Sequence, residues 1–187
     1  MKTENTALLL IDIQNDYFPG GKMELSGTVD AGDNAGRILD ACRMRGITVV
    51  HIQHLSVRAG AGFFIPGTEG AEINRVVAPI PGETVIQKNF PNSFRNTDLL
   101  DYLKNRNITE LLICGMMTHM CIDATVRAAF DYGFECTVAG DACATRNLSQ
   151  DGVEIPALHV HHAFLAALGS VYAKRLNTGD LIKFITI

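Results

Sequence analysis

A cysteine near the centre of the chain has the surroundings of a nucleophile. Cys121 follows an apolar run over residues 111–114 that ends at Gly115. Thr118 is a candidate N-cap for a helix over residues 119–131, which places Cys121 in a first helical turn after a buried strand. Helix-end N–H groups favour a thiolate, and nucleophiles on such sharp strand-to-helix turns recur in α/β hydrolases. The alternative is a small buried core residue.

Two further reactive side chains follow strands that would end beside Cys121. Asp12 lies at the end of the first apolar run, residues 7–13, and Lys88 follows a short strand over residues 84–87. Ligands of open parallel sheets bind beyond the carboxyl ends of the strands, where neighbouring strands would bring acid, amine and thiol together. Asp12 would then accept the thiol proton, and Lys88 would keep Asp12 ionised and favour the thiolate. Alternatively, Asp12 caps a loop and Lys88 is solvated.

Alternating strands and helices must position these groups. Continuous apolar strands favour a mostly parallel sheet covered on both faces, and no linker divides residues 1–187, so we expect one α/β domain. Gly46 suits the residue after a helix, and Pro156 suits the first turn of another. The pattern predicts further helices over residues 29–45, 97–105 and 156–172 and further strands over residues 48–52, 110–114, 135–139 and 181–185.

The composition excludes several classes of protein. The 187 residues are 47% hydrophobic and 19% charged, with a formal net charge of −4, as in a globular protein. The chain contains no run of Lys and Arg residues of the kind that binds nucleic acid, so a nucleic-acid partner is not expected. No apolar run reaches the roughly 18 residues of a membrane helix. The amino-terminal residues show no signal-peptide pattern, and the five cysteines form no CxxC pair. We therefore expect a cytoplasmic protein with reduced thiols.

Three motifs share their order and spacing with a known enzyme family. Asp12 lies in LLLIDIQNDYF, Lys88 in VIQKNFPNSF and Cys121 in GMMTHMC. Across nearly the whole chain the sequence resembles the isochorismatase-like cysteine hydrolases, which include nicotinamidases and N-carbamoylsarcosine amidases. The resemblance implies a Rossmann-like three-layer α/β/α sandwich, with Asp12, Lys88 and Cys121 as a catalytic triad.

The resemblance also implies a reaction. It predicts a cis peptide between Met116 and Met117, and an oxyanion hole formed by the N–H groups of Met117 and Cys121. A small amide or related C–N bond would be cleaved through a thioester on Cys121, with Asp12 as general acid and base and Lys88 as electrostatic partner. Two alternatives remain: a non-covalent hydrolase of an isochorismate-like vinyl ether with Asp12 as the acid, and a non-enzymatic thiol sensor.

No metal or cofactor is expected. Metal-dependent members of the resembled family place an Asp-x-His pair and a later His after the second strand. Here His51 and His54 stand alone, and two histidines three residues apart on a strand do not make a three-ligand site. His159, His161 and His162 lie on the last predicted helix, where packing is favoured over metal binding.

The expected substrate pocket and assembly depend on a long loop and on the predicted helix 156–172. The Gly/Pro-rich segment 55–81 is long enough to be a functional or flexible loop. Helix 156–172 is apolar on more than one face, which predicts a homo-oligomer, a dimer or a tetramer. Asp141 is expected to bind N–H groups of its own loop, and Cys143 receives no role. Candidate contacts to a small-molecule substrate are Gln14, Phe18, Phe63, Phe64, Phe90 and His119, although Phe63 and Phe64 could instead anchor the loop.

Overall fold

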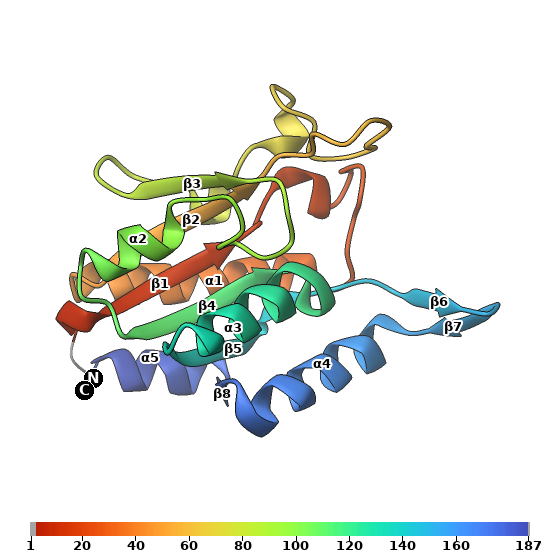
Figure 1. The fold of residues 1–187 in the computed structure, drawn as a ribbon. Coiled ribbons are helices and arrows are strands. Elements are labelled where there is room, and N and C mark those ends of the chain that lie inside the picture. Colours follow the sequence, from red (N-terminus) through yellow and green to blue (C-terminus); the bar gives the residue numbers. More distant parts are fainter. Residues whose placement is uncertain (1–2, 187) are drawn as a thin grey trace.

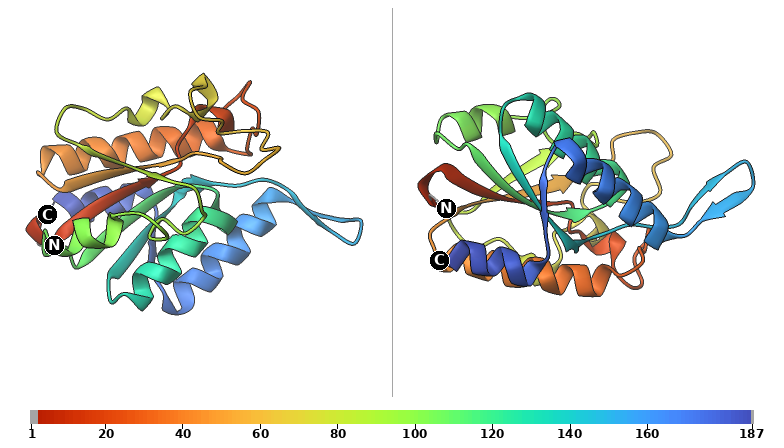
Figure 2. Two further views of the ribbon diagram at one scale, coloured as in Figure 1. Left: turned by 45° about the horizontal axis from the view of Figure 1, so that its top comes forward. Right: turned by 90° about the horizontal axis from the view of Figure 1, so that it is seen from below.

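A six-stranded parallel sheet lies between two layers of helices (Figures 1 and 2). This confirms the expected α/β/α sandwich. The structure is a computed structural model that describes residues 3–186. Helices α1 (Thr28–Met44) and α5 (Thr178–Thr186) cover one face, and α2 (Leu99–Lys104), α3 (Asp123–Asp131) and α4 (Ala157–Val171) cover the other. The strand order is β3 (Thr84–Lys88), β2 (Thr48–His54), β1 (Thr6–Ile11), β4 (Glu110–Met116), β5 (Glu135–Ala144), β8 (Lys174–Leu176).

The two central strands form the middle of the core. Every residue of β1 is buried, and Leu8 pairs with Leu112 on β4. Both faces of the sheet are covered, which explains why these strands read as continuous apolar runs. Ile11, the last residue of β1, pairs with Gly115 of β4 and with Ile52 of β2. The carboxyl ends of three strands therefore meet at one edge.

The final element differs from its prediction. Residues 181–185 were expected to form a closing strand, but they lie within helix α5, and the sixth strand is β8. Thr178, Leu181 and Ile185 are the buried residues of α5, at the spacing of one helical face. Asn177 accepts a hydrogen bond from the N–H of Asp180 (2.8 Å), as a helix cap does. A short apolar run alone does not distinguish the two structures.

The segment around Cys121 also differs in detail. A single π-helical turn, Thr118–Ile122, precedes α3, so Cys121 lies before the regular helix begins. Thr118 is not an N-cap: its hydroxyl lies 3.2 Å from the carbonyl oxygen of Ala144 and 2.9 Å from Nδ1 of His161. It thereby ties the turn to β5 and α4. The peptide bond between Met116 and Met117 is cis.

A hairpin that the sequence pattern did not indicate projects from the body between β5 and α4. Strands β6 (Leu148–Gln150) and β7 (Val153–Ile155) pair only with each other in the described sheets, and Figure 1 shows them extending beyond the sandwich. Short 3-10 turns cover Thr3–Asn5, Asn15–Tyr17, Glu69–Ala71 and Arg75–Val77.

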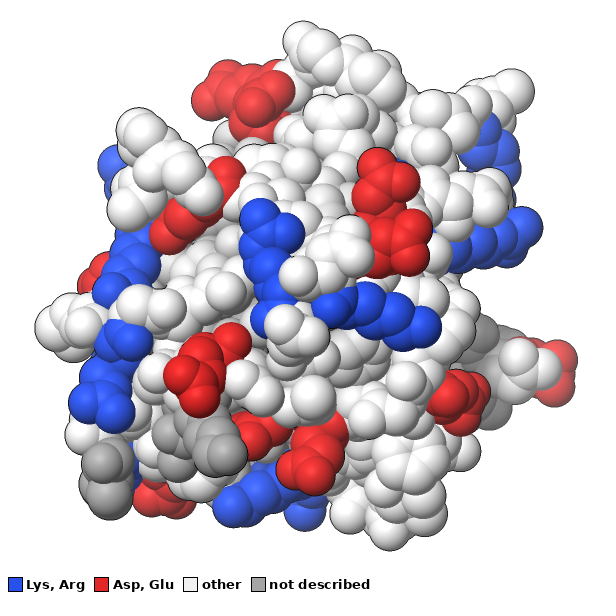
Figure 3. Space-filling view, turned by 60° about the vertical axis from the view of Figure 1, so that its left-hand side comes forward, with Lys and Arg blue, Asp and Glu red and all other residues white. Residues whose placement is uncertain are grey.

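The surface and the helices give two further observations. The side of the molecule near both termini carries acidic and basic side chains interspersed (Figure 3). None of the helices described between residues 3 and 186 combines the length and apolar character that a membrane crossing needs.

Gly115 is expected to be indispensable for folding. Its φ is +131°, and a Cβ there would collide with the carbonyl oxygen of Ile11. Gly133 is a matched control, because its φ is +89° but a Cβ would meet nothing within 4 Å. Gly133→Ala should lower the free energy of unfolding by about 1 kcal/mol, from backbone strain alone. Gly115→Ala should lower it by about 3 kcal/mol or more. Equal losses in urea denaturation would contradict this account of the turn.

Candidate active site

A buried ion pair joins the ends of β1 and β3. Lys88 Nζ lies 2.7 Å from Asp12 Oδ2, and both side chains are fully shielded from solvent. Lys88 Nζ also donates to the carbonyl oxygens of Phe90 (3.1 Å) and Pro91 (3.3 Å) and to Nδ1 of His54 (3.2 Å). Burial lowers the pKa of Lys88, but attraction to Asp12 and Cys121 outweighs it and leaves the pKa raised. Lys88 is thus a buried ammonium rather than a solvated charge.

Local backbone geometry sets the direction of Asp12. The residue follows β1 directly, and its N–H donates to the carbonyl oxygen of Ile52 on β2 (3.0 Å). Its φ of +53° lies in the left-handed region, which a non-glycine residue seldom adopts without a reason. His54 pairs with Lys88 in the register of β2 and β3, so their side chains arrive at the same edge of the sheet.

Cys121 lies against this pair. Its sulfur, an oxygen of Asp12 and a ring nitrogen of His54 all lie within 4.8 Å of one another. Asp12 Oδ1 is buried and has no hydrogen-bond partner among the described residues. A carboxylate oxygen without a partner, close to a thiol, is suited to accept the thiol proton.

The surroundings of Cys121 favour the thiolate less than its predicted place at a helix end suggested. Burial raises the pKa of Cys121 well above its usual range, and the charge of Asp12 raises it further, while Lys88 lowers it only in part. The side chain is 5% exposed and precedes α3, so desolvation outweighs any effect of a helix end. The neutral thiol is therefore the favoured form of Cys121, and a nucleophilic role would need a base to take its proton.

His54 also belongs to the site, although the sequence pattern raised it only as a possible metal ligand. Burial lowers its pKa, and the charge of Lys88 lowers it further, while Asp12 acts in the opposite direction. An ammonium can only donate, so Nδ1 of His54 accepts from Lys88 and the ring proton lies on Nε2. The ring thus positions Lys88 without adding charge to the site.

The donor set formed by Asp12, His54 and Cys121 does not suit a divalent cation. The ammonium of Lys88 already binds Asp12 and His54, the same side chains that a metal ion would need. His51, the other histidine of β2, bonds instead to Glu83 (2.9 Å). The two histidines of β2 therefore do not meet at one site.

Cys121 opens into a cavity of about 510 Å³, a volume typical of small-molecule sites. Phe63 and Phe90 line it, as expected. Phe64 instead lies behind the wall, where its ring packs 4.5 Å from that of Tyr17 and its N–H donates to Asp16 Oδ2 (2.6 Å). The other lining residues, none of them singled out in the sequence as pocket residues, are Tyr17, His54, Ser56, Val57, Arg58, Gly60, Ala61, Gly62, Asn89, Pro91, Met117 and Met120.

Besides Phe64, three more of the predicted pocket residues do not line this cavity. Gln14 binds backbone instead: its amide nitrogen donates to the carbonyl oxygens of His54 (2.9 Å) and Ala71 (2.7 Å). Phe18 packs where a Cβ on Gly32 of α1 would lie. The ring of His119 lies 2.5 Å from the Thr145 hydroxyl and packs edge-on against Phe164. The assignment of these three side chains to the wall of this cavity is therefore corrected.

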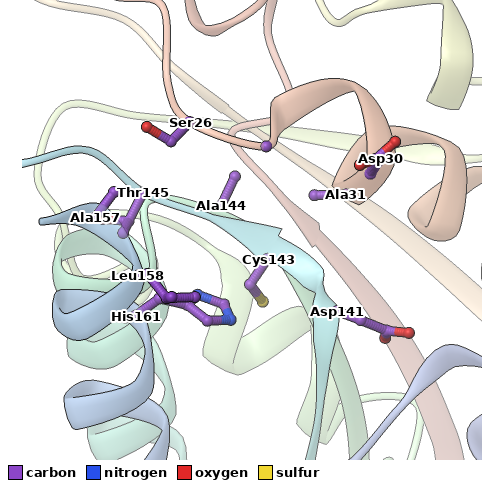
Figure 4. A pocket seen from close by; sticks show the side chains of 11 residues that line it. Ser26, Asp30, Ala31, Asp141, Cys143, Ala144, Thr145, Ala157, Leu158 and His161 are labelled. Atoms are coloured by element: carbon purple, nitrogen blue, oxygen red, sulfur yellow. The ribbon is translucent and has the colours of Figure 1, made fainter.

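A second cavity of about 320 Å³ lies between the start of α1, the end of β5 and α4 (Figure 4). Cys143 and His161 line it, and Cys143 Sγ donates to the carbonyl oxygen of Ala139 (3.3 Å). The Asp141 prediction is corrected: its carboxylate accepts from the N–H and hydroxyl of Thr178, at 2.7 Å each, rather than from its own loop. This cavity does not include Cys121.

A family model, curated relatives and solved structures all match this chain to the same family. Residues 6–164 match the isochorismatase domain. The isochorismatase family protein YddQ of Bacillus subtilis is 52% identical, covering 95% of this chain and 99% of its own. The crystal structure of an isochorismatase hydrolase from Oleispira antarctica is 49% identical, with a TM-score of 0.93 over 98% of this chain and 99% of that one. Escherichia coli nicotinamidase is 28% identical, covering 85% of this chain and 89% of its own.

The match to the family model extends over most of the described fold and includes all three residues that meet at the carboxyl edge of the sheet. The sequence motifs around Asp12, Lys88 and Cys121 thus occur in a fold that the comparisons share. The chain belongs to the isochorismatase family of hydrolases.

Proposed function

We propose that this hydrolase cleaves a small amide or a related C–N bond through a thioester on Cys121. One observation carries the proposal: a buried Asp12–Lys88 ion pair leaves Asp12 Oδ1 without a partner beside a thiol that opens into a cavity. A relative named nicotinamidase supports amide cleavage as the reaction class. No part of the proposed chemistry requires a metal or an organic cofactor.

The reaction would run in two halves. Cys121 Sγ attacks the carbonyl carbon while Asp12 takes the thiol proton, and the N–H groups of Met117 and Cys121 would hold the resulting oxyanion. The protonated Asp12 then passes its proton to the departing nitrogen, which leaves as ammonia or an amine. Water next attacks the thioester as Asp12 accepts its proton. The acid product leaves, and the proton returns to Cys121.

Lys88 would balance charge throughout this cycle. A carboxylate and a forming thiolate are two negative charges in a buried space, and like charges disfavour each other's ionised form. The ammonium of Lys88, 2.7 Å from Asp12, offsets that repulsion. It also holds the Asp12 side chain in place, since Oδ2 is committed to Lys88 while Oδ1 is left for the proton transfer.

The two alternative functions fit the site less well. Vinyl-ether hydrolysis with Asp12 as the acid gives the thiol of Cys121 no part, although that thiol lies within 4.8 Å of the carboxylate. A thiol sensor needs an accessible sulfur with a low pKa. Cys121 is 5% exposed and its pKa is raised, which opposes oxidation in the resting protein.

Replacing the nucleophile should abolish hydrolysis. Cys121→Ala should keep the fold and lower the rate of ammonia release from a panel of small primary amides by more than about 10³-fold. Cys143→Ala is the matched control, because that thiol is equally buried but lines the second cavity. Substantial turnover by Cys121→Ala, with unchanged thermal unfolding, would end the covalent proposal.

Removing the cation should make Cys121 harder to ionise. Lys88 lowers the pKa of Cys121, so in Lys88→Met the pH profile of iodoacetamide alkylation should move to higher pH. Acylation should slow by roughly 10²–10⁴-fold. Lys104→Met, at the exposed end of α2, should behave as wild type. Superimposable profiles for wild type and Lys88→Met would remove Lys88 from the triad.

We also propose that the chain forms a homo-oligomer through α4 and the adjacent hairpin. Leu158 on α4 is 63% exposed and Val153 on β7 is 65% exposed. A two-stranded hairpin alone in water is marginally stable, so the projecting β6–β7 pair needs a covering surface. A second copy, which presents the same apolar residues, is the occupant we propose.

We further propose a cytoplasmic location, with which the five free thiols agree.

A polar substitution on this face should weaken the assembly. Light scattering at micromolar concentration should give a multiple of the single-chain mass for the wild type, and Leu158→Ser should shift the population toward the single chain because apolar contact area is lost. Met44→Ser provides the control, since Met44 is 77% exposed at the end of α1 and lies on another face. A wild type that scatters as a single chain would refute the assembly.

A further inference from the structure

The cavity at Cys121 contains one formal charge. Among the described residues that line it, Arg58 is the only charged side chain, and no aspartate or glutamate is present. The histidine of the lining, His54, is held neutral by burial and by the neighbouring ammonium of Lys88. A bound molecule would therefore meet a positive charge and no negative one on the cavity wall.

The carboxylates behind the wall do not offset this charge. Asp12 is paired with Lys88. Asp16 accepts hydrogen bonds from the backbone N–H groups of Lys22 (3.1 Å) and Phe64 (2.6 Å), so both of its oxygens are engaged. The guanidinium of Arg58 itself forms no ion pair or hydrogen bond with any residue in the range 3–186. Its charge thus remains available to a ligand.

The rest of the wall adds apolar surface, and a second arginine, outside the lining, packs against one of its rings. Phe63, Phe90 and Val57 line the cavity. The guanidinium of Arg95 lies 3.8 Å from the centre of the Phe90 ring, in the geometry of a cation–π contact. This places a further cation next to the cavity wall.

We propose that the substrates of this enzyme are small amides that also carry a carboxylate, which Arg58 binds while the amide carbonyl lies at Cys121. The proposal rests on the amide hydrolysis proposed above and narrows its substrate class. The planar guanidinium offers a carboxylate two parallel hydrogen bonds, and the apolar walls would hold the carbon chain between the two ends. Neutral amides would lose this contact, and cationic amides would be repelled.

Two alkylating agents test the charge without requiring turnover. Iodoacetate and iodoacetamide deliver the same reactive carbon to Cys121, but only the first carries a negative charge. The ratio of their rates, iodoacetate over iodoacetamide, should fall about tenfold in Arg58→Gln, since a hydrogen bond to a charged group contributes about 1.5–3 kcal/mol. Arg58→Lys should restore part of the ratio. Arg37→Gln, an exposed arginine of α1, should leave it unchanged.

A protection experiment extends the test to substrate-sized molecules. Succinamate should slow iodoacetamide labelling of Cys121 at concentrations about tenfold below those needed for succinamide, its neutral counterpart, and Arg58→Gln should remove the difference. Equal protection by both compounds, or an unchanged alkylation ratio in Arg58→Gln, would overturn the assignment of Arg58. A preserved charge preference without any amide turnover would instead refute the proposed hydrolysis, so the two failures are distinguishable.

Discussion

The buried ion pair between Asp12 and Lys88 is the interaction on which the site depends. Two opposite charges removed from water are tolerated only when their geometry and remaining hydrogen bonds are good, and removing one partner costs about 3–5 kcal/mol. Here three further acceptors lie within hydrogen-bond distance of the ammonium, so its three N–H groups are all satisfied. The pair requires β1, β2 and β3 to end together. The register of the parallel sheet therefore determines the geometry on which the chemistry of the site depends.

The same pair explains how a reactive thiol can be kept inactive. Burial and the charge of Asp12 hold Cys121 in its protonated form, while the partnerless oxygen of Asp12 stands ready to accept the proton. In the proposed reaction, activation would therefore coincide with attack on a carbonyl group, whose developing charge the N–H groups of Met117 and Cys121 would stabilise. A buried thiol of this kind is also protected from adventitious oxidation. In the proposed mechanism, the stability of the resting thiol and its reactivity toward substrate would follow from the same arrangement of charges.

Much of this arrangement could be predicted from the sequence. Apolar runs covered on both faces identify β1 and β4, and parallel strands bring Asp12, Lys88 and Cys121 to one edge. The prediction of a strand over residues 181–185, where α5 lies, was wrong because a five-residue apolar run fits either a strand or a helix. The assignments of Gln14, Phe18, Phe64 and His119 to the cavity wall were wrong because the direction of a loop or turn side chain depends on long-range contacts. Arg58 and Tyr17 could not be assigned to the cavity wall from the sequence, because only the folded structure places them beside Cys121.

The central claim is that Asp12 takes the Cys121 proton as a thioester forms. The most direct test is acid-quenched peptide mass spectrometry during turnover of a small amide, compared between the wild type and Asp12→Asn. The account predicts a hydroxylamine-sensitive acyl adduct on the Cys121 peptide of the wild type and none on that of Asp12→Asn. Product formation without an adduct on Cys121, or an adduct that forms equally fast in Asp12→Asn, would contradict it.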